Sequence, residues 1–223
     1  MIRCEELGID NLKIIQDCDL FCFGTDSVAL SKFARAKKGD RVVDLCTGNG
    51  IIPVLMSAYT KAEDFWGVEI QEPSYELAVK NAEINSLSGK VHFIKDDIKN
   101  VLNHFKNGSV DVVTCNPPYM SVTAGFKNEA DTLKIARHEI LIDLDGVVKS
   151  ASDILKFGGN FFMVHRAERL CDVICTLRKY TLEPKRIRFL APSSEKAPNL
   201  LLIEAKKGAK PPIKFEPTEF VNV

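Results

Sequence analysis

The chain has 223 residues, of which 45% are hydrophobic and 27% charged, and its formal net charge at pH 7 is zero. This length and balance suit one globular domain and exclude a fibrous or intrinsically disordered chain. No run approaches the roughly 18 consecutive apolar residues of a membrane span, and the first residues, MIRCEELGID, bring acids where a secretory signal brings an apolar core. We therefore expect a cytoplasmic monomer that does not act at a membrane.

Apolar periodicity and turn residues predict alternating strands and helices along the chain. In chain order we expect a hairpin from LKIIQ and DLFCF, a helix capped by Thr25 or Asp26 through SVALSKFARA, a strand at 41–46, a helix at 51–59, a strand at 65–70, a helix at 73–86, strands at 91–94 and 110–115, a helix at 144–157, a strand at 160–164, a helix at 167–180, and the strands RIRFL and LLLIEA.

This alternation predicts a single-domain α/β fold, a Rossmann-like, doubly wound and mostly parallel sheet with helices on both faces. The last two strands lack a long crossover helix between them, so we expect an antiparallel strand at one edge. Residues 1–35 would form a hairpin and helix lid over the ligand site, and residues 36–206 the main domain. Residues 207–223, rich in Pro, Gly and Lys, would form a loose C-terminal tail.

The zero net charge conceals an asymmetry along the chain. Residues 178–214 contain ten Lys or Arg against three Asp or Glu, whereas residues 1–177 contain twenty against twenty-five. A basic stretch of this kind suits a polyanion such as nucleic acid, although a run of charge is more often a solvated face.

The seven cysteines are an odd number and include no C-x-x-C pair, which suits a reducing compartment. We interpret Cys18 with Cys22, and Cys171 with Cys175, as small buried side chains rather than zinc ligands. We expect no metal site.

A glycine-containing turn follows the strand that begins at residue 41, within VVDLCTGNG at 42–50. Gly48 and Gly50 let the backbone approach a ligand at a helix N-terminus. Glu69 ends the next strand, where an acid can bind both ribose hydroxyls, and Asp97 ends the third. These residues predict a nucleoside ligand at the carboxyl edge of the sheet.

The charge near the turn distinguishes between two candidate nucleoside cofactors. A dinucleotide places a pyrophosphate over the turn and needs a small residue three positions after the second glycine, where this chain has Pro53. The carboxylate of Asp44 would repel a pyrophosphate, and it favours a cation such as the α-ammonium group of S-adenosylmethionine. We therefore predict S-adenosylmethionine rather than NAD.

Four motifs on successive strand ends, D-L-C-T-G-N-G, G-V-E-I, K-D-D-I and N-P-P-Y, resemble the class I S-adenosylmethionine-dependent methyltransferases of the N6-adenine type. Upstream I-I-Q…F-G-T-D-S-V-A-L-S-K-F-A and downstream A-R-H-E and K-A-P-N-L-L-L-I-E-A-K-K-G are similar to one branch, the bacterial tRNA adenine-N6 methyltransferases that act beside the anticodon of a valine tRNA. The resemblance covers most of the chain. It departs at Cys46, where many class I enzymes have the first glycine of the turn.

The resemblance implies a set of cofactor-binding residues. Asp44 and the backbone of Gly48 and Gly50 would hold the methionine part of the cofactor. Glu69 would bind the ribose and Asp97 the adenine amino group. The implied set is Phe23, Gly24, Thr25, Asp44, Cys46, Gly48, Gly50, Glu69, Ile70, Asp97 and Asn116, of which the first three would close over the cofactor from the preceding segment.

Two adjacent acids are candidates for the adenine contact. Asp96 and Asp97 both follow the third strand, and neighbouring side chains on a strand end point in opposite directions. Ile98, as the inward apolar residue, favours Asp97, and Asp96 remains the alternative.

The motif Asn116-Pro117-Pro118-Tyr119 fits methylation of a planar amine. The lone pair of such an amine is delocalised, so acceptors must draw its hydrogens out of plane and stabilise the positive charge that develops. The side-chain oxygen of Asn116 and the carbonyl oxygen of Pro117 are suitable acceptors, and Tyr119 would stack on a base that has been flipped out of its helix. Prolines hold the preceding residues extended, which makes this surface rigid.

Three other functions share features with this chain. Protein-glutamine N5 methyltransferases also use N-P-P-Y, but they carry a separate helical N-terminal domain, whereas only about forty residues precede the Asp44 strand here. Guanine N2 enzymes more often have Phe after the two prolines. A catalytically silent, methyltransferase-like RNA-binding subunit would be expected to lose an acid of the cofactor site or the N-P-P-Y motif, and this chain retains both.

We expect the substrate to be RNA, and specifically tRNA. Basic side chains should then contact its phosphates. The candidates are Lys127 and Arg137, after the N-P-P-Y motif, and Arg186 and Arg188, in the basic C-terminal stretch.

Overall fold

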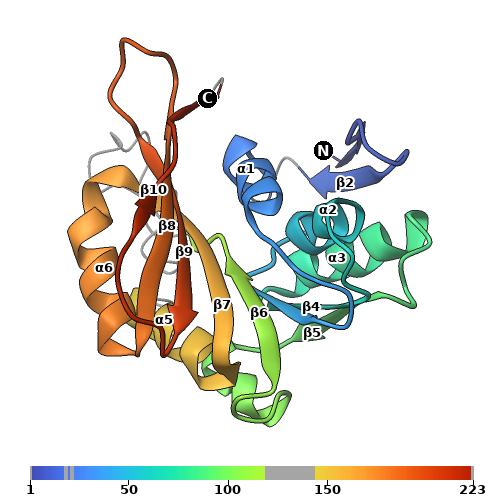
Figure 1. Cartoon of the computed structure of the whole chain (residues 1–223). Helices are drawn as coiled ribbons and strands as arrows, with labels where there is room; N and C mark the ends of the chain where they lie inside the picture. Colours follow the sequence, from blue (N-terminus) through green and yellow to red (C-terminus); the bar gives the residue numbers. More distant parts are fainter. Residues whose placement is uncertain (1, 18–19, 21–22, 119–143, 222–223) are drawn as a thin grey trace, which may run out of the picture.

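The computed structural model describes residues 2–17, 20, 23–118 and 144–221. A nine-stranded sheet, in the order β10-β8-β9-β7-β6-β3-β4-β5 with β11 also paired to β8, runs through the molecule (Figure 1). Its strands are β3 (Arg41–Leu45), β4 (Asp64–Glu69), β5 (Val91–Lys95), β6 (Val110–Cys115), β7 (Leu155–Arg166), β8 (Leu182–Ala191), β9 (Leu200–Lys207), β10 (Lys214–Phe215) and β11 (Glu219–Phe220).

The sheet is parallel from β5 through β4, β3 and β6 to β7. Strand β9 then runs antiparallel between β7 and β8. This confirms the predicted α/β fold and its antiparallel edge, which arises because β8 and β9 are joined without a crossover helix.

Helices cover both faces of the sheet (Figure 1). One apolar cluster contains side chains of α1, α2 and α3, and the other contains side chains of η1, α5 and α6. The bounds are α1 (Thr25–Phe33), α2 (Ile51–Tyr59), α3 (Glu72–Ile84), η1 (Ile98–Asn103), α5 (Leu144–Ile154), η2 (Ala167–Arg169) and α6 (Leu170–Lys179).

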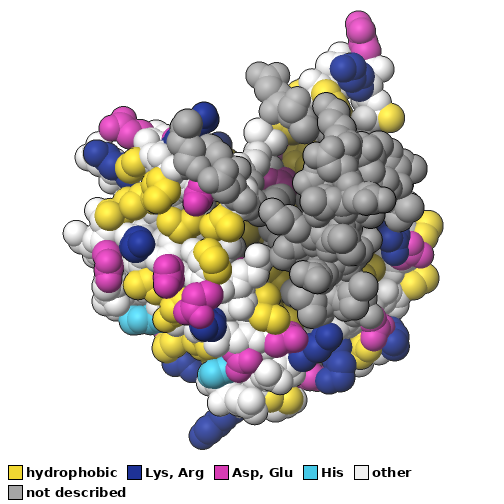
Figure 2. Space-filling view, turned by 180° about the vertical axis from the view of Figure 1, so that it is seen from behind, with side chains coloured by type: hydrophobic (Ala, Val, Ile, Leu, Met, Phe, Trp, Pro, Cys, Tyr) yellow, Lys and Arg dark blue, Asp and Glu magenta, His cyan; other side chains and the backbone are white. Residues whose placement is uncertain are grey.

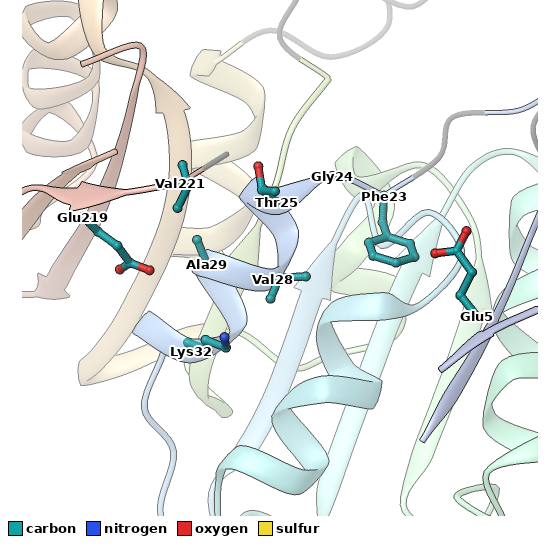
Figure 3. A pocket seen from close by; sticks show the side chains of 9 residues that line it. All are labelled: Glu5, Phe23, Gly24, Thr25, Val28, Ala29, Lys32, Glu219 and Val221. Carbon is teal, nitrogen blue, oxygen red and sulfur yellow. The ribbon is translucent and has the colours of Figure 1, made fainter. Parts of the chain in front are cut away.

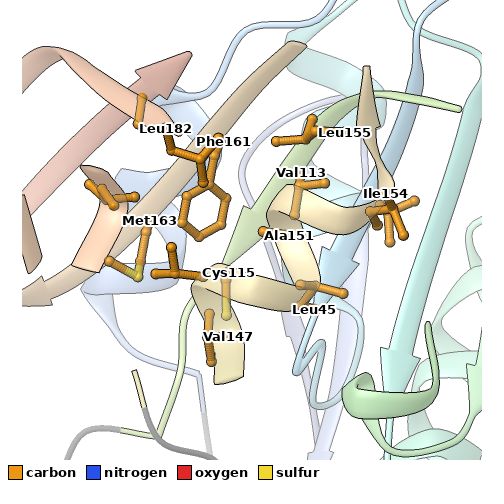
Figure 4. Close-up of a cluster of buried hydrophobic side chains, with 14 of the residues drawn as sticks. Leu45, Val113, Cys115, Val147, Ala151, Ile154, Leu155, Phe161, Met163 and Leu182 are labelled. Atoms are coloured by element: carbon orange, nitrogen blue, oxygen red, sulfur yellow. The ribbon is translucent and has the colours of Figure 1, made fainter. Parts of the chain in front are cut away.

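The central strands supply alternate side chains to the two clusters, as a strand buried on both faces requires. In β6, Val113 and Cys115 belong to the cluster with α5, and Val112 belongs to the opposite one. Figure 4 shows Val113 and Cys115 among the side chains of α5 and β7. The residue that follows Cys115 therefore leaves a strand anchored on both faces.

Strand β7 begins earlier than the sequence predicts. Helix α5 ends at Ile154, and the glycines expected to stop it, Gly158 and Gly159, lie inside β7. A Cβ on Gly159 would come within 3.0 Å of the carbonyl oxygens of Asp111 and Lys156, so the close backbone approach explains the glycine better than a helix end does.

The N-terminal hairpin also differs from expectation. Strand β2 (Lys13–Asp17) pairs with β1 (Ile2–Glu6), which the sequence did not predict as a strand. The predicted partner, DLFCF, lies in part outside the described residues. The turn between them contains Gly8, Asp10 and Asn11 with positive φ, which are residue types that adopt this conformation readily.

Asn81 of α3 and Asn85, the C-cap of that helix, attach this hairpin to the main domain. Asn81 accepts from Ile15 N at 2.6 Å and donates to Ile15 O at 2.9 Å. One helical turn later, Asn85 accepts from Lys13 N at 2.8 Å and donates to Lys13 O at 2.7 Å. These side-chain amides satisfy backbone groups of β2 as a neighbouring strand would.

The C-terminal segment is attached to the sheet in the structure, where the sequence predicts a loose tail. Strands β10 and β11 pair with β8. Ion pairs reinforce this attachment: Arg186 contacts Glu204 at 2.6 Å and Glu216 at 3.2 Å, and Arg188 contacts Glu216 at 2.7 Å and Glu219 at 2.6 Å.

These ion pairs engage two side chains that the sequence assigned to RNA. Arg186 is 6% exposed, and it also donates to Phe33 O at 2.8 Å while its guanidinium stacks 3.8 Å from the Phe33 ring. Arg188 donates to two carboxylates. Both guanidinium groups bind within the protein, so Arg186 and Arg188 are better explained as structural residues than as phosphate contacts.

Candidate functional site

Four predicted site residues lie at or just beyond the carboxyl ends of neighbouring parallel strands. Asp44 is the fourth residue of β3, Glu69 ends β4, Asp97 follows β5 and Asn116 follows β6. The strands are adjacent in the order β6-β3-β4-β5. In open α/β sheets the ligand crevice forms at this edge, so the sheet gathers the residues that the motifs singled out.

The turn after β3 has an unusual backbone. Cys46, Gly48 and Gly50 have φ of 59°, 58° and 81°, in the left-handed region. Glycine adopts this conformation freely and cysteine at some cost, so the backbone at Cys46 has a conformation that favours glycine. The cysteine preserves the turn despite the departure from the motif.

Glu69 stabilises the turn from the end of β4. It is 4% exposed, and its carboxylate accepts from Gly48 N and Gln71 N, both at 2.9 Å. The acid predicted to bind a ribose therefore also connects β4 to the glycine turn. Ile70, the next residue, is half-buried.

A phenyl ring lies against the glycine turn. A Cβ on Gly50 would come 2.6 Å from the Phe93 ring, and a Cβ on Gly67 would come equally close to it. Gly50 thus allows Phe93 of β5 to pack against the turn, which is a second reason for glycine there besides its positive φ.

Asp44 lies under the turn and not at its surface. It is 1% exposed, and it accepts from the hydroxyls of Thr47 and Thr114, both at 2.6 Å. Burial raises the pKa of Asp44 to about 7, and the charge of Glu69 adds to the shift. Each Asp44 oxygen accepts from one hydroxyl, so Asp44 connects the turn to β6. Its contact with a cofactor ammonium group stays a prediction.

The two candidate acids after β5 differ in their contacts. Asp96 accepts from Asp97 N and Asn100 Nδ2 and contacts His104 Nε2 at 2.7 Å, so both of its oxygens are engaged. These hydrogen bonds lower the pKa of Asp96. Asp97 caps η1 through one oxygen, which accepts from Lys99 N at 2.9 Å. This favours Asp97 as the residue that can also bind a ligand.

Asn116 lies beside the turn and is held by α1. Leu45 of β3 is paired with Cys115 of β6, so the next residues, Cys46 and Asn116, leave adjacent strands together. The Asn116 amide Nδ2 donates to Asp26 Oδ2 at 3.1 Å and to Ser27 Oγ at 2.8 Å. Pro117, which follows, is buried.

The predicted cover residues Phe23, Gly24 and Thr25 line a hollow of about 480 Å³ beside α1 (Figure 3). The other lining residues are Glu5, Val28, Ala29, Lys32, Glu219 and Val221. None of the strand-end acids appears in this lining, so among the described residues the hollow is separate from the edge that carries Asp44 and Glu69.

Three predicted residues, Tyr119, Lys127 and Arg137, lie outside the described residues. Four residues that sequence reasoning did not place at the site contact it: Asp26 and Ser27 bind Asn116, and Thr47 and Thr114 bind Asp44. The motif F-G-T-D-S contained a signal for the first pair, but the sequence predicted Thr25 or Asp26 only as the cap of a helix. That prediction was wrong: the N-cap of α1 is Gly24, and Asp26 lies in the first turn of the helix.

Over the described part of the chain, no three His, Cys, Asp or Glu side chains are grouped as metal ligands, and no helix is long and apolar enough to cross a bilayer. The prediction that Cys171 and Cys175 are buried was wrong, because α6 exposes both side chains. Figure 2 shows basic and acidic side chains interspersed on one face of the molecule.

Comparison with known proteins agrees with this geometry. The chain is 25% identical over 182 residues to a Photobacterium profundum protein named tRNA1(Val) (adenine(37)-N6)-methyltransferase, covering 81% of this chain and 75% of that one. A Parabacteroides distasonis protein of the same name is 26% identical over 190 residues, covering 84% and 78%.

Among solved structures, a predicted O-methyltransferase from Agrobacterium tumefaciens has a TM-score of 0.69 and 18% identity, covering 87% of this chain and 86% of that one, which shows the same fold. A family model described as a methyltransferase domain matches residues 36–199. With the glycine turn, the strand-end acids and Asn116 all inside the matched region, the chain belongs to this methyltransferase domain family.

Proposed function

We propose that this protein transfers a methyl group from S-adenosylmethionine to the exocyclic N6 amine of adenine in RNA, with tRNA as the substrate. The observation that carries the proposal is the position of Asn116-Pro117 directly beside the glycine turn, on the strand paired to β3. The relatives named as tRNA adenine-N6 methyltransferases support the choice of adenine and tRNA.

The residues at the turn suit the cofactor. Glu69 offers a carboxylate at the end of β4, in contact with the turn backbone. Asn49, 6% exposed within the turn, has a buried Nδ2 atom without a hydrogen-bond partner among the described residues. An unsatisfied buried donor is costly, so a ligand acceptor at this point would be stabilising. When bound, S-adenosylmethionine supplies an electrophilic methyl group.

The protein's part in the reaction is to bind and activate the amine. The Asn116 Oδ1 and Pro117 O atoms accept its two hydrogens, which draws the nitrogen lone pair out of conjugation. So held, the nitrogen would present its lone pair to the methyl group that bound S-adenosylmethionine would supply. The positively charged nitrogen then releases a proton to water, so no stronger base is required.

Substitution of Asn116 tests this function. Asn116→Ala should still fold and bind the cofactor in calorimetry, and should lose about 10²–10³ in the rate of methyl transfer, the scale of one lost transition-state contact. The matched control is Asn103→Ala, which removes the side chain of an exposed asparagine in η1 and should keep the wild-type rate. Near-normal turnover by Asn116→Ala would contradict the proposed mechanism.

The substrate is tested separately, by nucleoside mass spectrometry of total tRNA and rRNA from cells with and without the protein. Loss of one N6-methyladenosine from the tRNA fraction supports the proposal. An unchanged nucleoside pattern, together with methylation of a glutamine side chain in a protein, would show that the substrate is a protein and not RNA. Absence of cofactor binding in calorimetry would favour the alternative function, a catalytically silent RNA-binding subunit.

A further inference from the structure

The side chain of Asn116 is oriented by the first turn of α1. Its Nδ2 atom donates to the carboxylate of Asp26 at 3.1 Å and to the hydroxyl of Ser27 at 2.8 Å. Asp26 is half-buried and Ser27 is 3% exposed, so these contacts are largely shielded from water. Ninety residues separate Asp26 from Asn116 in the chain, so the contact depends on the tertiary structure.

The chemistry of Asp26 determines which way the Asn116 amide points. An ionised carboxylate only accepts hydrogen bonds, whereas an amide has a donor end and an acceptor end. The donor end must therefore face Asp26, and the acceptor Oδ1 faces away from it. A serine hydroxyl can accept or donate, so Ser27 alone would not select one orientation.

Asp26 is itself held in place locally. Its Oδ1 accepts from Ser27 N at 2.7 Å, which leaves Oδ2 for Asn116. A Cβ on Gly24 would come 2.8 Å from Oδ1, so the carboxylate occupies space that only glycine leaves open. Each oxygen thus accepts at least one hydrogen bond, and an amide in place of the carboxylate could accept at only one of the two positions.

We infer that Asp26 is a positioning residue for methyl transfer: it holds the Asn116 amide with Oδ1 toward the amine to be methylated. The inference rests on the proposed function and deepens it. The negative charge of Asp26 also polarises the amide and strengthens Oδ1 as an acceptor, because charge-assisted hydrogen bonds reinforce their neighbours. Asp26 acts through Asn116 and needs no contact with the substrate.

An exchange of the two side chains tests the orientation. Asp26→Asn alone should lower kcat about 10²-fold, the scale of a misplaced reacting group, with the cofactor Kd unchanged. Asn116→Asp alone should lose at least as much, because two carboxylates would face each other. In the double variant Asp26→Asn/Asn116→Asp the new amide donates to the new carboxylate. Its kcat relative to wild type should exceed the product of the relative kcat values of the two single variants about tenfold or more, because residues in contact are not additive.

Two further variants separate position from fold stability. Gly24→Ala should displace the Asp26 carboxylate and lower kcat while the melting temperature stays near that of wild type. Asp40→Asn removes the same charge from an aspartate that also accepts a backbone N–H, from Lys37 at 2.8 Å, and should keep full activity. The inference would be overturned if the relative kcat of the double variant equalled the product of the relative kcat values of the two single variants. It would also be overturned if Asp26→Asn weakened cofactor binding and left kcat unchanged.

A second readout does not depend on the substrate. The side-chain NH₂ resonances of Asn116, assigned by their absence in Asn116→Ala, should exchange slowly with water in wild type and faster in Asp26→Asn. An unchanged exchange rate of these NH₂ protons in Asp26→Asn would show that Asp26 does not hold the Asn116 amide. If the wild type shows protected Asn116 resonances but leaves adenine in RNA unmethylated, the proposed function fails and the Asp26 contact stands.

Discussion

The buried carboxyl group of Asp44 links stability to pH. Burial raises its pKa to about 7, whereas an aspartate in the unfolded chain has a pKa of about 3.9. The folded protein therefore binds this proton more tightly than the unfolded chain does. Stability consequently falls as the pH rises from about 4 through about 7, because in that range folding requires proton uptake at Asp44. Asp44→Asn should remove this dependence and keep two hydrogen bonds, because the hydroxyls of Thr47 and Thr114 can donate or accept.

His165 acts in the opposite direction. It is 7% exposed, and burial, assisted by the charge of Arg169, lowers its pKa to about 4. Its Nδ1 atom accepts from Arg166 N at 2.9 Å, which requires that nitrogen to be unprotonated. Folding thus favours the neutral ring, and stability rises with pH between about 4 and 6.5.

The two effects can be compared between pH 5 and pH 8. From these pKa values, Asp44 should lower the free energy of unfolding by about 2.5 kcal/mol over this range, and His165 should raise it by about 2 kcal/mol. The wild type should therefore change little. Asp44→Asn should become more stable by about 2 kcal/mol on going from pH 5 to pH 8, and His165→Asn less stable by about 2.5 kcal/mol.

Urea unfolding followed by circular dichroism at pH 5, 6, 7 and 8 measures these differences directly. The His165→Asn variant serves as the internal control, because its slope has the opposite sign and its new side-chain oxygen can still accept from Arg166 N. Equal changes between pH 5 and pH 8 in wild type and Asp44→Asn would refute the argument that Asp44 is protonated in the folded protein near neutral pH.

Three further substitutions test how the elements are held together. Asn85→Ala should cost about 1–2 kcal/mol for the two lost hydrogen bonds to β2, and hydrogen exchange should quicken in the N-terminal hairpin before other parts of the sheet. Arg186→Ala should lower the free energy of unfolding by about 3 kcal/mol, since it removes a buried guanidinium group that binds Glu204, Glu216 and the Phe33 carbonyl oxygen, and an unchanged urea midpoint would contradict this. Gly50→Ala should cost about 1–3 kcal/mol through overpacking against Phe93; Gly89→Ala, where a Cβ meets nothing within 4 Å, should leave the melting temperature unchanged.

Much of the fold was predictable from local patterns. The helix at 51–59 and the strand at 110–115 have the predicted bounds, because apolar periodicity and turn glycines act over a few residues. The partner of β2 was not predicted correctly because the sequence offers both DLFCF and the segment that forms β1 as neighbouring strand candidates, and local pattern does not distinguish them. The C-terminal strands escaped prediction because two residues each are too short to show a period.

The sequence by itself determined the α/β alternation, the glycine turn and the Asn-Pro-Pro motif, since each depends on residues adjacent in the chain. Only the tertiary structure decided what the single side chains do. It buried Asp44 between two hydroxyls, engaged Arg186 with acids from β9 and the C-terminal segment, and brought Asp26 to Asn116 across ninety residues. The physical reason is that burial and hydrogen-bond partners are set by elements distant in sequence, and these determine whether a charged side chain binds a ligand or another part of the protein.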